Sequence, residues 1–307
     1  MKQSVHLAVP LGKTFERKLA ERYEVVTGEA GSKTAKAIIT VGTMRADGAY
    51  MDARPELRLI CCLGSGYESI DIGAATARGI KVTNTVGANA PMVADHAVAL
   101  LLASVRHVVT GDRLMRAGEW RGENPAALLF ARGLTGRKIG IVGLGAIGGK
   151  IASRLAAFET EIGYHGRREK KDTPYRYFAS VTGLAEWADA LVLAHRADDT
   201  NRHIVNAGVI EALGPMGHIV NISRGSAIDE DALVAALKDG KLAGAGLDVF
   251  EGEPDIRADL AALPNVVVTP HIGGATSEAL MAMSDAVIAN LDAFFDRRSL
   301  PNPVPPG

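Results

Sequence analysis

The stretch that decides the fold is KIGIVGLGAIGGKIA, at residues 138–152. It begins with a short apolar run typical of a buried strand, continues through Gly143, Gly145 and Gly148, and opens a helical pattern that ends at Phe158. A strand, three glycines at this spacing and a helix form the turn that binds the pyrophosphate of a dinucleotide. The first glycine permits the tight turn, the second lets the pyrophosphate approach the backbone, and the third lets the helix pack closely on the strand.

Two further features concern how this turn would hold its cofactor. The N–H groups at the start of the helix, at Ala146 and Ile147, are expected to bind the anion, because a helix begins with unpaired N–H groups. About 20 residues past the glycines, where an acidic residue would bind the ribose of NAD, the sequence has Arg167 and Arg168. Two guanidinium groups favour the 2′-phosphate of NADPH, whereas Glu169 beside them keeps NADH possible.

Short apolar runs bounded by turn residues recur on both sides of this turn, with helical patterns between them. Alternating strands and helices predict an α/β protein with parallel sheets. The predicted strands before the turn are Val5–Val9, Ala37–Val41, Leu57–Leu63 and Ile80–Thr83. Those from the turn onward are Lys138–Val142, Glu161–His165, Ala190–Ala194, His218–Ile222, Gly244–Val249 and Val266–Thr269.

The chain of 307 residues is long for one core, so we expect two domains. No linker rich in glycine, serine or charge separates the two series of strands, so two long helical patterns, Val93–Met115 and Ser277–Phe295, are expected to carry the boundaries. The first is predicted to be one long, mostly buried helix. We place a doubly wound, parallel-sheet Rossmann domain at residues 100–281, inserted into a substrate domain made of residues 1–99 and 282–307.

The composition disfavours several other classes of protein. The net charge is −1 and the basic residues are scattered, so neither nucleic acid nor an anionic membrane is an expected partner. No run of about 18 apolar residues and no signal pattern occur, which favours a cytoplasmic protein. The adjacent Cys61 and Cys62 are interpreted as buried, reduced thiols. The eight histidines show no metal-ligand spacing, so no metal is expected.

Three residues follow three different strands of the predicted dinucleotide-binding domain: Arg224, Glu253 and His271. The carboxyl ends of parallel strands line one crevice, so these side chains can converge although they are far apart in sequence. Each alone could be an ordinary loop residue, but together they suit the reduction of a carbonyl group. An imidazolium donates a proton to the carbonyl oxygen, a carboxylate keeps the imidazolium oriented and protonated, and a guanidinium binds a substrate carboxylate.

The chain resembles the D-isomer-specific 2-hydroxyacid dehydrogenases over essentially its whole length. The matching blocks are LGSGYESID (63–71), VADHAVALLLA (93–103), VGLGAIGGKIA (142–152), VNISRGSAIDEDALVAAL (220–237), AGAGLDVFEGEP (243–254) and NVVVTPHIGGAT (265–276). The resemblance implies a Rossmann domain inserted into a split, flavodoxin-like substrate domain, a cleft between them, a homodimer, and hydride transfer from NAD(P)H to a small 2-oxo acid. The segment from Tyr164 to Tyr177 is similar to the family's NADPH-preferring glyoxylate and hydroxypyruvate reductases.

The same resemblance implies roles for individual residues. It makes Arg224, Glu253 and His271 the catalytic arginine, glutamate and histidine. It also implies that Asp248 holds the nicotinamide carboxamide, and that Val93 lies near the nicotinamide ring.

The resemblance further implies a substrate loop outside the dinucleotide-binding domain. This loop is Gly64, Ser65 and Gly66, whose backbone N–H groups would bind the substrate carboxylate opposite the catalytic arginine.

Several points stay open. Where many members of the family have Pro-Leu-Thr beside the adenosine, this chain has His195-Arg196-Ala197, and Arg196 could assist a 2′-phosphate. His96 is interpreted as a buried helix histidine rather than a catalytic one, and Trp120–Phe130 as part of a dimer arm. The alternatives are a D-lactate-type or phosphoglycerate-type dehydrogenase, or a non-enzymatic nucleotide-sensing protein like the corepressors that resemble this family.

Overall fold

The computed structural model describes residues 2–120, 122 and 131–307, which divide into two compact units. Unit 1 contains the chain up to Ala90 together with Gly274–Gly307, and unit 2 is Pro91–Gly273. The expected boundaries, at 99/100 and 281/282, fall inside two long helices, α5 (Ala90–Val105) and α13 (Ser277–Phe295). In the structure the chain passes between the units near the beginning of each helix instead. All but the first residue of α5 therefore belongs to unit 2, and α13 belongs to unit 1.

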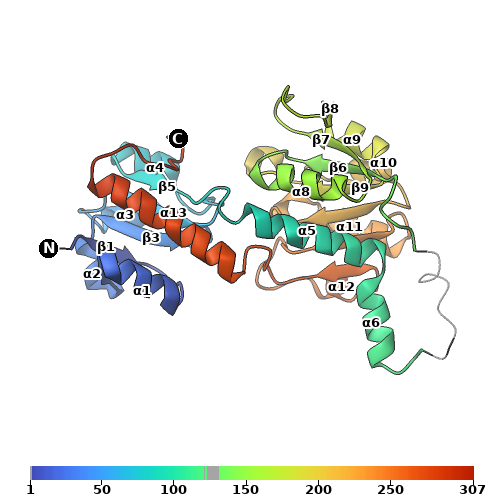
Figure 1. The fold of residues 1–307 in the computed structure, drawn as a ribbon, viewed down its shortest axis with the longest axis horizontal. Coiled ribbons are helices and arrows are strands. Elements are labelled where there is room, and N and C mark those ends of the chain that lie inside the picture. Colours follow the sequence, from blue (N-terminus) through green and yellow to red (C-terminus); the bar gives the residue numbers. More distant parts are fainter. Residues whose placement is uncertain (1, 121, 123–130) are drawn as a thin grey trace. The chain divides into compact units, whose positions relative to one another are not determined.

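Unit 1 is built on a five-stranded parallel sheet in the order β2-β1-β3-β4-β5, with helices on both faces (Figure 1). Its strands are β1 Ser4–Leu7, β2 Glu24–Val26, β3 Ala37–Val41, β4 Leu59–Leu63 and β5 Lys81–Thr83. Its helices, besides α13, are α1 Lys13–Arg22, α2 Gly28–Thr34, α3 Gly48–Asp52 and α4 Ile72–Ala77. Ile38 and Ile39 belong to apolar clusters on opposite faces, which explains why the central strands are apolar throughout.

Unit 2 contains a seven-stranded parallel sheet in the order β12-β11-β10-β9-β6-β7-β8. Its strands are β6 Lys138–Val142, β7 Glu161–His165, β8 Arg176–Phe178, β9 Ala190–Leu193, β10 His218–Asn221, β11 Gly244–Leu247 and β12 Val266–Val268. Its helices, besides α5, are α6 Val108–Arg116, α8 Ala146–Ala156, α9 Val181–Trp187, α10 Ala207–Leu213, α11 Glu230–Lys238 and α12 Ala258–Ala261. The strand order reverses between β6 and β9, and ligands of doubly wound folds bind at the carboxyl ends of the strands at such a point. This is the Rossmann architecture expected from the glycine turn.

The sheet of unit 2 is buried on both faces. Leu191 and Leu193 of β9 pack into one apolar cluster together with residues of α9, α10 and α11. Ala190 and Val192 of the same strand pack into a second cluster with residues of α5 and α8. Two covered faces hold the strands in place, so the loops at their carboxyl ends start from fixed positions.

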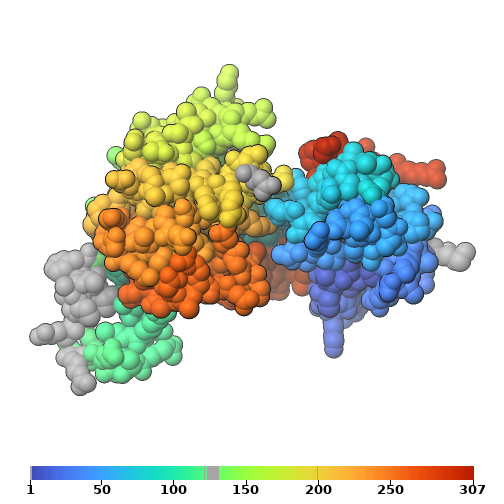
Figure 2. Space-filling model, turned by 180° about the vertical axis from the view of Figure 1, so that it is seen from behind, coloured from blue at the N-terminus to red at the C-terminus, as the bar shows by residue number. Residues whose placement is uncertain are grey.

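The prediction of one long, mostly buried helix over Val93–Met115 is wrong. The segment forms two helices, α5 and α6, bent by 65°. His107, at the break, has a positive φ of 51°, which an uninterrupted helix cannot accommodate. No residue of α6 is buried, and α6 stands out from the body of unit 2 (Figures 1 and 2). Apolar composition alone therefore did not indicate burial here.

Three remaining sequence expectations concern the rest of the chain. Cys61 and Cys62 are buried and unbridged in β4, and burial raises the pKa of the Cys61 thiol to about 12. Among the described residues no single helix is long and apolar enough to cross a membrane, although α5 and α6 taken together reach that length and hydropathy. The expected dimer arm, Trp120–Phe130, lies mostly outside the described residues.

Candidate active site

The glycine turn between β6 and α8 has the geometry that its sequence predicts. Gly143 has a φ of 97°, and its N–H donates to the carbonyl oxygen of His165 at 2.8 Å. A Cβ at Gly148 would lie 2.0 Å from the carbonyl oxygen of Gly143, so only glycine allows this approach of helix and turn. Gly145 faces open space and precedes the first residues of α8, Ala146 and Ile147. The N–H groups there are the unpaired ones that a helix N-terminus offers to an anion.

A basic loop follows β7, which ends at His165. The loop is attached at both ends: the Tyr177 hydroxyl donates to the carbonyl oxygen of Gly166 at 3.3 Å, and the N–H of Lys170 donates to the hydroxyl of Tyr164 at 2.7 Å. Between these attachments, Arg167 and Arg168 are exposed.

The side chain of Lys170 joins this loop to the glycine turn. Its Nζ donates to the carbonyl oxygen of Leu144 at 2.5 Å. The two arginines expected to bind a 2′-phosphate are therefore held next to the pyrophosphate turn by a lysine that the sequence analysis did not single out.

His195 begins the His195-Arg196-Ala197 segment after β9, which the family resemblance places beside the adenosine. A Cβ at Gly143 would lie 2.5 Å from the Cα of His195, so the two backbones are in contact. Both ring nitrogens of His195 are buried and neither makes a hydrogen bond of good geometry with the described residues. Burial lowers the pKa of this imidazole, and the smaller effects of Asn201 and Asp198 do not reverse the shift. His195 is therefore a neutral side chain that packs against the first glycine of the turn.

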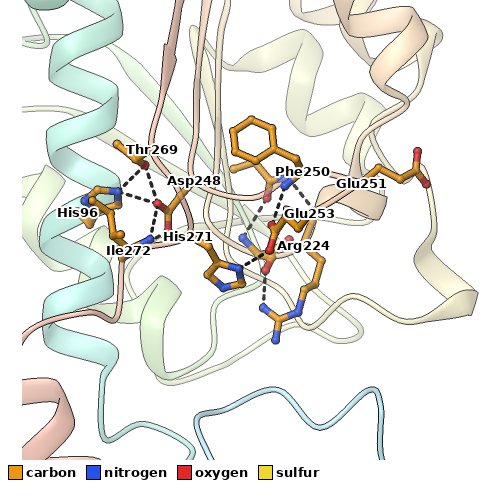
Figure 3. Close-up of polar contacts among 12 residues, drawn as sticks. His96, Arg224, Asp248, Phe250, Glu251, Glu253, Thr269, His271 and Ile272 are labelled. Carbon is orange, nitrogen blue, oxygen red and sulfur yellow. Dashed lines mark hydrogen bonds and ion pairs between the residues drawn. The ribbon is translucent and has the colours of Figure 1, made fainter. Parts of the chain in front are cut away.

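The predicted histidine and glutamate form a pair at the carboxyl ends of β11 and β12. The Nδ1 atom of His271 lies 2.7 Å from Oε2 of Glu253 (Figure 3). The other carboxylate oxygen, Oε1, accepts the N–H of Phe250 at 2.9 Å. Because an ionised carboxylate only accepts hydrogen bonds, His271 donates Nδ1–H to it. Within the described residues Nε2 of His271 makes no hydrogen bond, and the side chain is 41% exposed. Nε2 is thus the ring nitrogen available to a substrate.

The loop after β10 brings Arg224 to the same place (Figure 3). The side chain of Asn221 holds the loop from inside: its Oδ1 accepts the N–H of Ser223 at 3.0 Å, and its Nδ2 donates to the carbonyl oxygen of Arg224 at 2.8 Å. A Cβ at Gly225 would lie 1.9 Å from the carbonyl carbon of Phe250. The Arg224 loop therefore lies directly on the backbone that binds Glu253.

Asp248 anchors the loop that carries His271. Its carboxylate accepts hydrogen bonds from Thr269 Oγ1 at 2.6 Å and from the N–H groups of Ile272 and Gly273 at 2.9 and 2.8 Å, and it lies 3.2 Å from Nε2 of His96. Burial alone raises the pKa of this carboxyl group, but the four hydrogen bonds outweigh burial and leave the pKa below its usual value.

The polar contacts of His96 among the described residues are with this anchor, at Asp248 and at Oγ1 of Thr269. With a side chain that is 19% exposed, His96 is half-buried rather than buried as expected. Its position on α5, bonded to the anchor, fits a helix histidine, and its lack of a catalytic part stays a prediction. Val93, one turn earlier on α5, is buried, and a Cβ at Gly273 would lie 3.7 Å from its side chain. Val93 is thus next to the anchored loop.

The predicted substrate loop lies in unit 1, at the end of β4. Gly64 has a φ of 115°, and its N–H already donates to Oγ1 of Thr85 at 2.8 Å. The carbonyl oxygen of Ser65 accepts Asn84 Nδ2 at 2.9 Å. Among the described residues, no acceptor binds the N–H groups of Ser65 and Gly66. Of the three N–H groups expected to bind a carboxylate, two are therefore available.

The structure brings the three predicted catalytic residues together from the ends of three strands, as expected. It also shows contributors that the sequence analysis missed, namely Asn221 and Gly225. Asn221 is a polar residue at the end of an apolar strand, and Gly225 directly follows an arginine. Both features are visible in the sequence. Their partners, however, lie in loops that only the fold brings close.

A doubly wound sheet, a pyrophosphate turn and a histidine–carboxylate pair with an adjacent arginine define a dinucleotide-dependent oxidoreductase. Residues 98–273 match the family model described as "D-isomer specific 2-hydroxyacid dehydrogenase, NAD binding domain". The chain belongs to this family.

Three similar proteins cover most or nearly all of the chain. Glyoxylate/hydroxypyruvate reductase A of Arabidopsis thaliana is 37% identical and covers 98% of both chains. A glyoxylate reductase of Pyrococcus furiosus is 41% identical over 85% of this chain and 80% of its own. The structure of an NADPH-dependent glyoxylate/hydroxypyruvate reductase from Sinorhizobium meliloti, in complex with NADP and malonate, has a TM-score of 0.90 at 36% identity and covers 99% of this chain and 97% of its own.

Proposed function

We propose that this protein is an NADPH-dependent reductase that converts glyoxylate to glycolate or hydroxypyruvate to D-glycerate. The observation that carries the proposal is the His271–Glu253 pair, which leaves Nε2 available beside Arg224. The names of the relatives from Arabidopsis thaliana and Pyrococcus furiosus support the choice of substrate. The solved complex with NADP supports the choice of cofactor.

Each catalytic residue then has a defined task. Bound NADPH would supply the hydride that adds to C2 of the 2-oxo acid. His271 donates the proton on Nε2 to the carbonyl oxygen, so that the hydride forms the C2–H bond and this proton forms the hydroxyl group. Glu253 holds the opposite nitrogen as Nδ1–H, which leaves Nε2 facing the substrate. Arg224 binds the substrate carboxylate and polarises the carbonyl group.

The residues of unit 2 fit the cofactor. The turn at Gly143, Gly145 and Gly148 with the N–H groups of α8 would bind the pyrophosphate. Arg167 and Arg168 would bind the 2′-phosphate, because exposed guanidinium groups without ion pairs among the described residues can form charge-assisted bonds with it.

The nicotinamide would lie near the anchored loop. Oδ1 of Asp248 already has three polar contacts. Among the described residues Oδ2 accepts only the N–H of Gly273, so it retains capacity for the carboxamide. We place Val93 against the ring because its buried side chain is next to this loop.

The substrate loop would contribute its two available N–H groups. Ser65 and Gly66 would bind the substrate carboxylate, while Gly64 stays bound to Thr85 and shapes the turn. Of the three residues expected to bind the carboxylate, this proposal therefore keeps two as donors, Ser65 and Gly66.

We also propose a homodimer in the cytoplasm. Val108, Met115 and Trp120, on α6 or just after it, are all more than half exposed. No residue of α6 is buried within the chain, and large apolar side chains that lie exposed together in this way are typical of an interface. Buried thiols that form no disulfide, at Cys61 and Cys62, fit a reducing compartment.

The test is the initial rate of oxidation of NADPH and of NADH, each with glyoxylate, hydroxypyruvate, pyruvate and 3-phosphohydroxypyruvate. We expect the highest kcat/KM for NADPH with glyoxylate or hydroxypyruvate. A preference for pyruvate or for the phosphorylated acid would assign the chain to another subclass of the family. Tight cofactor binding without turnover of any acid would favour the nucleotide-sensing alternative.

A further inference from the structure

One buried carboxylate near the site has no part in the steps above. Glu230 is the first residue of α11, and it is 9% exposed. The helix does not need it as a cap, because Oδ1 of Asp229 already accepts the N–H of Ala232 at 3.1 Å. Burial of a carboxylate is costly unless its oxygens accept hydrogen bonds. The contacts of the Glu230 carboxylate should therefore explain why it is buried.

Glu230 binds the backbone next to the catalytic glutamate. Its Oε1 accepts the N–H of Glu251 at 2.8 Å. The preceding N–H, of Phe250, donates to Oε1 of Glu253 at 2.9 Å. Two successive N–H groups are thus held by two different carboxylates, one buried in α11 and one in the catalytic pair.

The same short backbone segment also supports the arginine loop. A Cβ at Gly225 would lie 2.1 Å from the nitrogen of Glu251, the atom that carries the hydrogen bond to Glu230. A shift of this nitrogen would therefore displace both the support of Arg224 and the N–H that orients Glu253.

The side chain of Glu251 itself is engaged elsewhere. It forms an ion pair with Arg202 and lies 3.6 Å from Nε2 of His203. In Figure 3 the Glu251 carboxylate points away from Glu253. Glu251 therefore contributes its backbone to the site, whereas Glu230 contributes a carboxylate.

We propose that Glu230 is a positioning residue. It fixes the Phe250–Glu251 backbone, so that Glu253 stays bonded to His271 and the Arg224 loop keeps its position. It touches neither substrate nor cofactor. The inference rests on the proposed function, because it assigns a role within that reaction.

The neighbouring Asp231 provides a matched control. It lies in the same first helical turn, its side chain is 89% exposed, and it pairs with Arg257 away from the catalytic pair. Glu230→Ala and Asp231→Ala each remove one negative charge from this turn. We expect Glu230→Ala to lower kcat about 10- to 100-fold, as a small misplacement of catalytic groups does, with the Kd of NADPH unchanged. Asp231→Ala should leave both unchanged.

Two comparisons separate positioning from a general loss of structure. Glu230→Gln keeps a carbonyl oxygen that can accept the Glu251 N–H, so it should restore most of the lost kcat. In a double-mutant cycle with Glu253→Gln, removal of Glu230 should cost far less than in the wild type, because its effect passes through Glu253. An equal loss in both backgrounds, or an unchanged kcat in Glu230→Ala, would overturn the inference.

A measurement without turnover distinguishes this inference from the proposed function. The imidazole signals of His271 in ¹H–¹⁵N spectra report its contact with Glu253 directly. We expect them to shift in Glu230→Ala and to stay in place in Asp231→Ala. If the wild type reduces no 2-oxo acid, the proposed function fails, and these spectra still decide whether Glu230 holds the pair. Identical His271 signals in both variants would reject its positioning role.

Discussion

The Nδ1 atom of His271 lies 2.7 Å from Oε2 of Glu253, although 17 residues separate the two in sequence. The contact forms because β11 and β12 are neighbouring parallel strands, whose loops leave the sheet at the same edge. The glutamate is fixed in turn by the Phe250 N–H, and the histidine loop by Asp248. The pair is therefore held from both sides before any substrate arrives.

Replacing His271 with Ala should remove the proton donor and leave the pyrophosphate turn intact. We expect kcat to fall about 10²- to 10⁴-fold, the range typical of general acid catalysis, with the Kd of NADPH nearly unchanged. Steady-state rates and fluorescence titration of NADPH measure the two quantities. Turnover at the wild-type level would remove His271 from the mechanism.

Replacing Glu253 with Gln tests the orientation of the histidine. An amide can offer its oxygen to His271 but carries no charge, so the imidazolium is less stabilised. We expect kcat for reduction to fall at least tenfold, with the Kd of NADPH nearly unchanged. Steady-state rates and fluorescence titration of NADPH measure the two quantities, and a wild-type kcat would contradict the prediction.

Replacing Arg167 and Arg168 together with Ala tests the cofactor preference. Each hydrogen bond to a charged group is worth about 1.5–3 kcal/mol, so the KM for NADPH should rise at least tenfold while the KM for NADH changes little. Lys171→Ala, in the same exposed segment, serves as the control. An equal rise in the KM for both cofactors would mean that the arginines do not bind the 2′-phosphate.

Replacing Gly225 with Ala should displace the arginine loop, because the added Cβ would overlap the backbone at Phe250 and Glu251. We expect a higher KM for the 2-oxo acid and a lower kcat, measured in the same assay. Gly208→Ala is the matched control, since its added Cβ would meet only ordinary contacts. A Gly225→Ala enzyme with wild-type constants would show that the loop position does not matter.

His218 predicts how stability depends on pH. The imidazole of His218 is buried, and its Nδ1 atom lies 2.9 Å from Oγ of Ser104. Burial and, to a smaller extent, the nearby charge of Arg137 lower its pKa to about 4. Below pH 6.5 the unfolded chain gains a proton that the folded chain does not. The stability that neutral His218 contributes is therefore complete above pH 6.5, and roughly 3 kcal/mol of it is lost as pH falls to 4.

Denaturant unfolding at pH 7 and at pH 4.5 measures this dependence. In His218→Gln the loss of stability between the two pH values should be clearly smaller than in the wild type. The same loss in both proteins would assign the effect to other groups.

Much of the fold could be predicted because the central strands have a clear signal. The predicted bounds of Ala37–Val41, Lys138–Val142 and Glu161–His165 agree with the structure, since these apolar runs are buried on both faces. The three-residue edge strands β2 and β8 were missed. Glu24–Val26 and Arg176–Phe178 have no buried residue, and each contains only two apolar residues, a run too short to indicate a strand.

The residues of the candidate site likewise fall into two groups, those that the sequence indicates and those that only the fold brings together. The predicted catalytic residues and the glycines could be singled out because each stands at a fixed place relative to a strand. Glu230 and Lys170 could not be found, because their partners, Glu251 and Leu144, are 21 and 26 residues away and only the packing of loops brings them together. Such contacts between loops leave no periodic pattern in a sequence.

Hydride transfer to C2 of a 2-oxo acid, with proton donation by His271, can be followed with hydroxypyruvate and NADPH deuterated at the transferred position of C4. We predict D-glycerate that carries deuterium at C2, formed about 10²- to 10⁴-fold more slowly by the His271→Ala variant. L-glycerate, or a product without deuterium at C2, would contradict it.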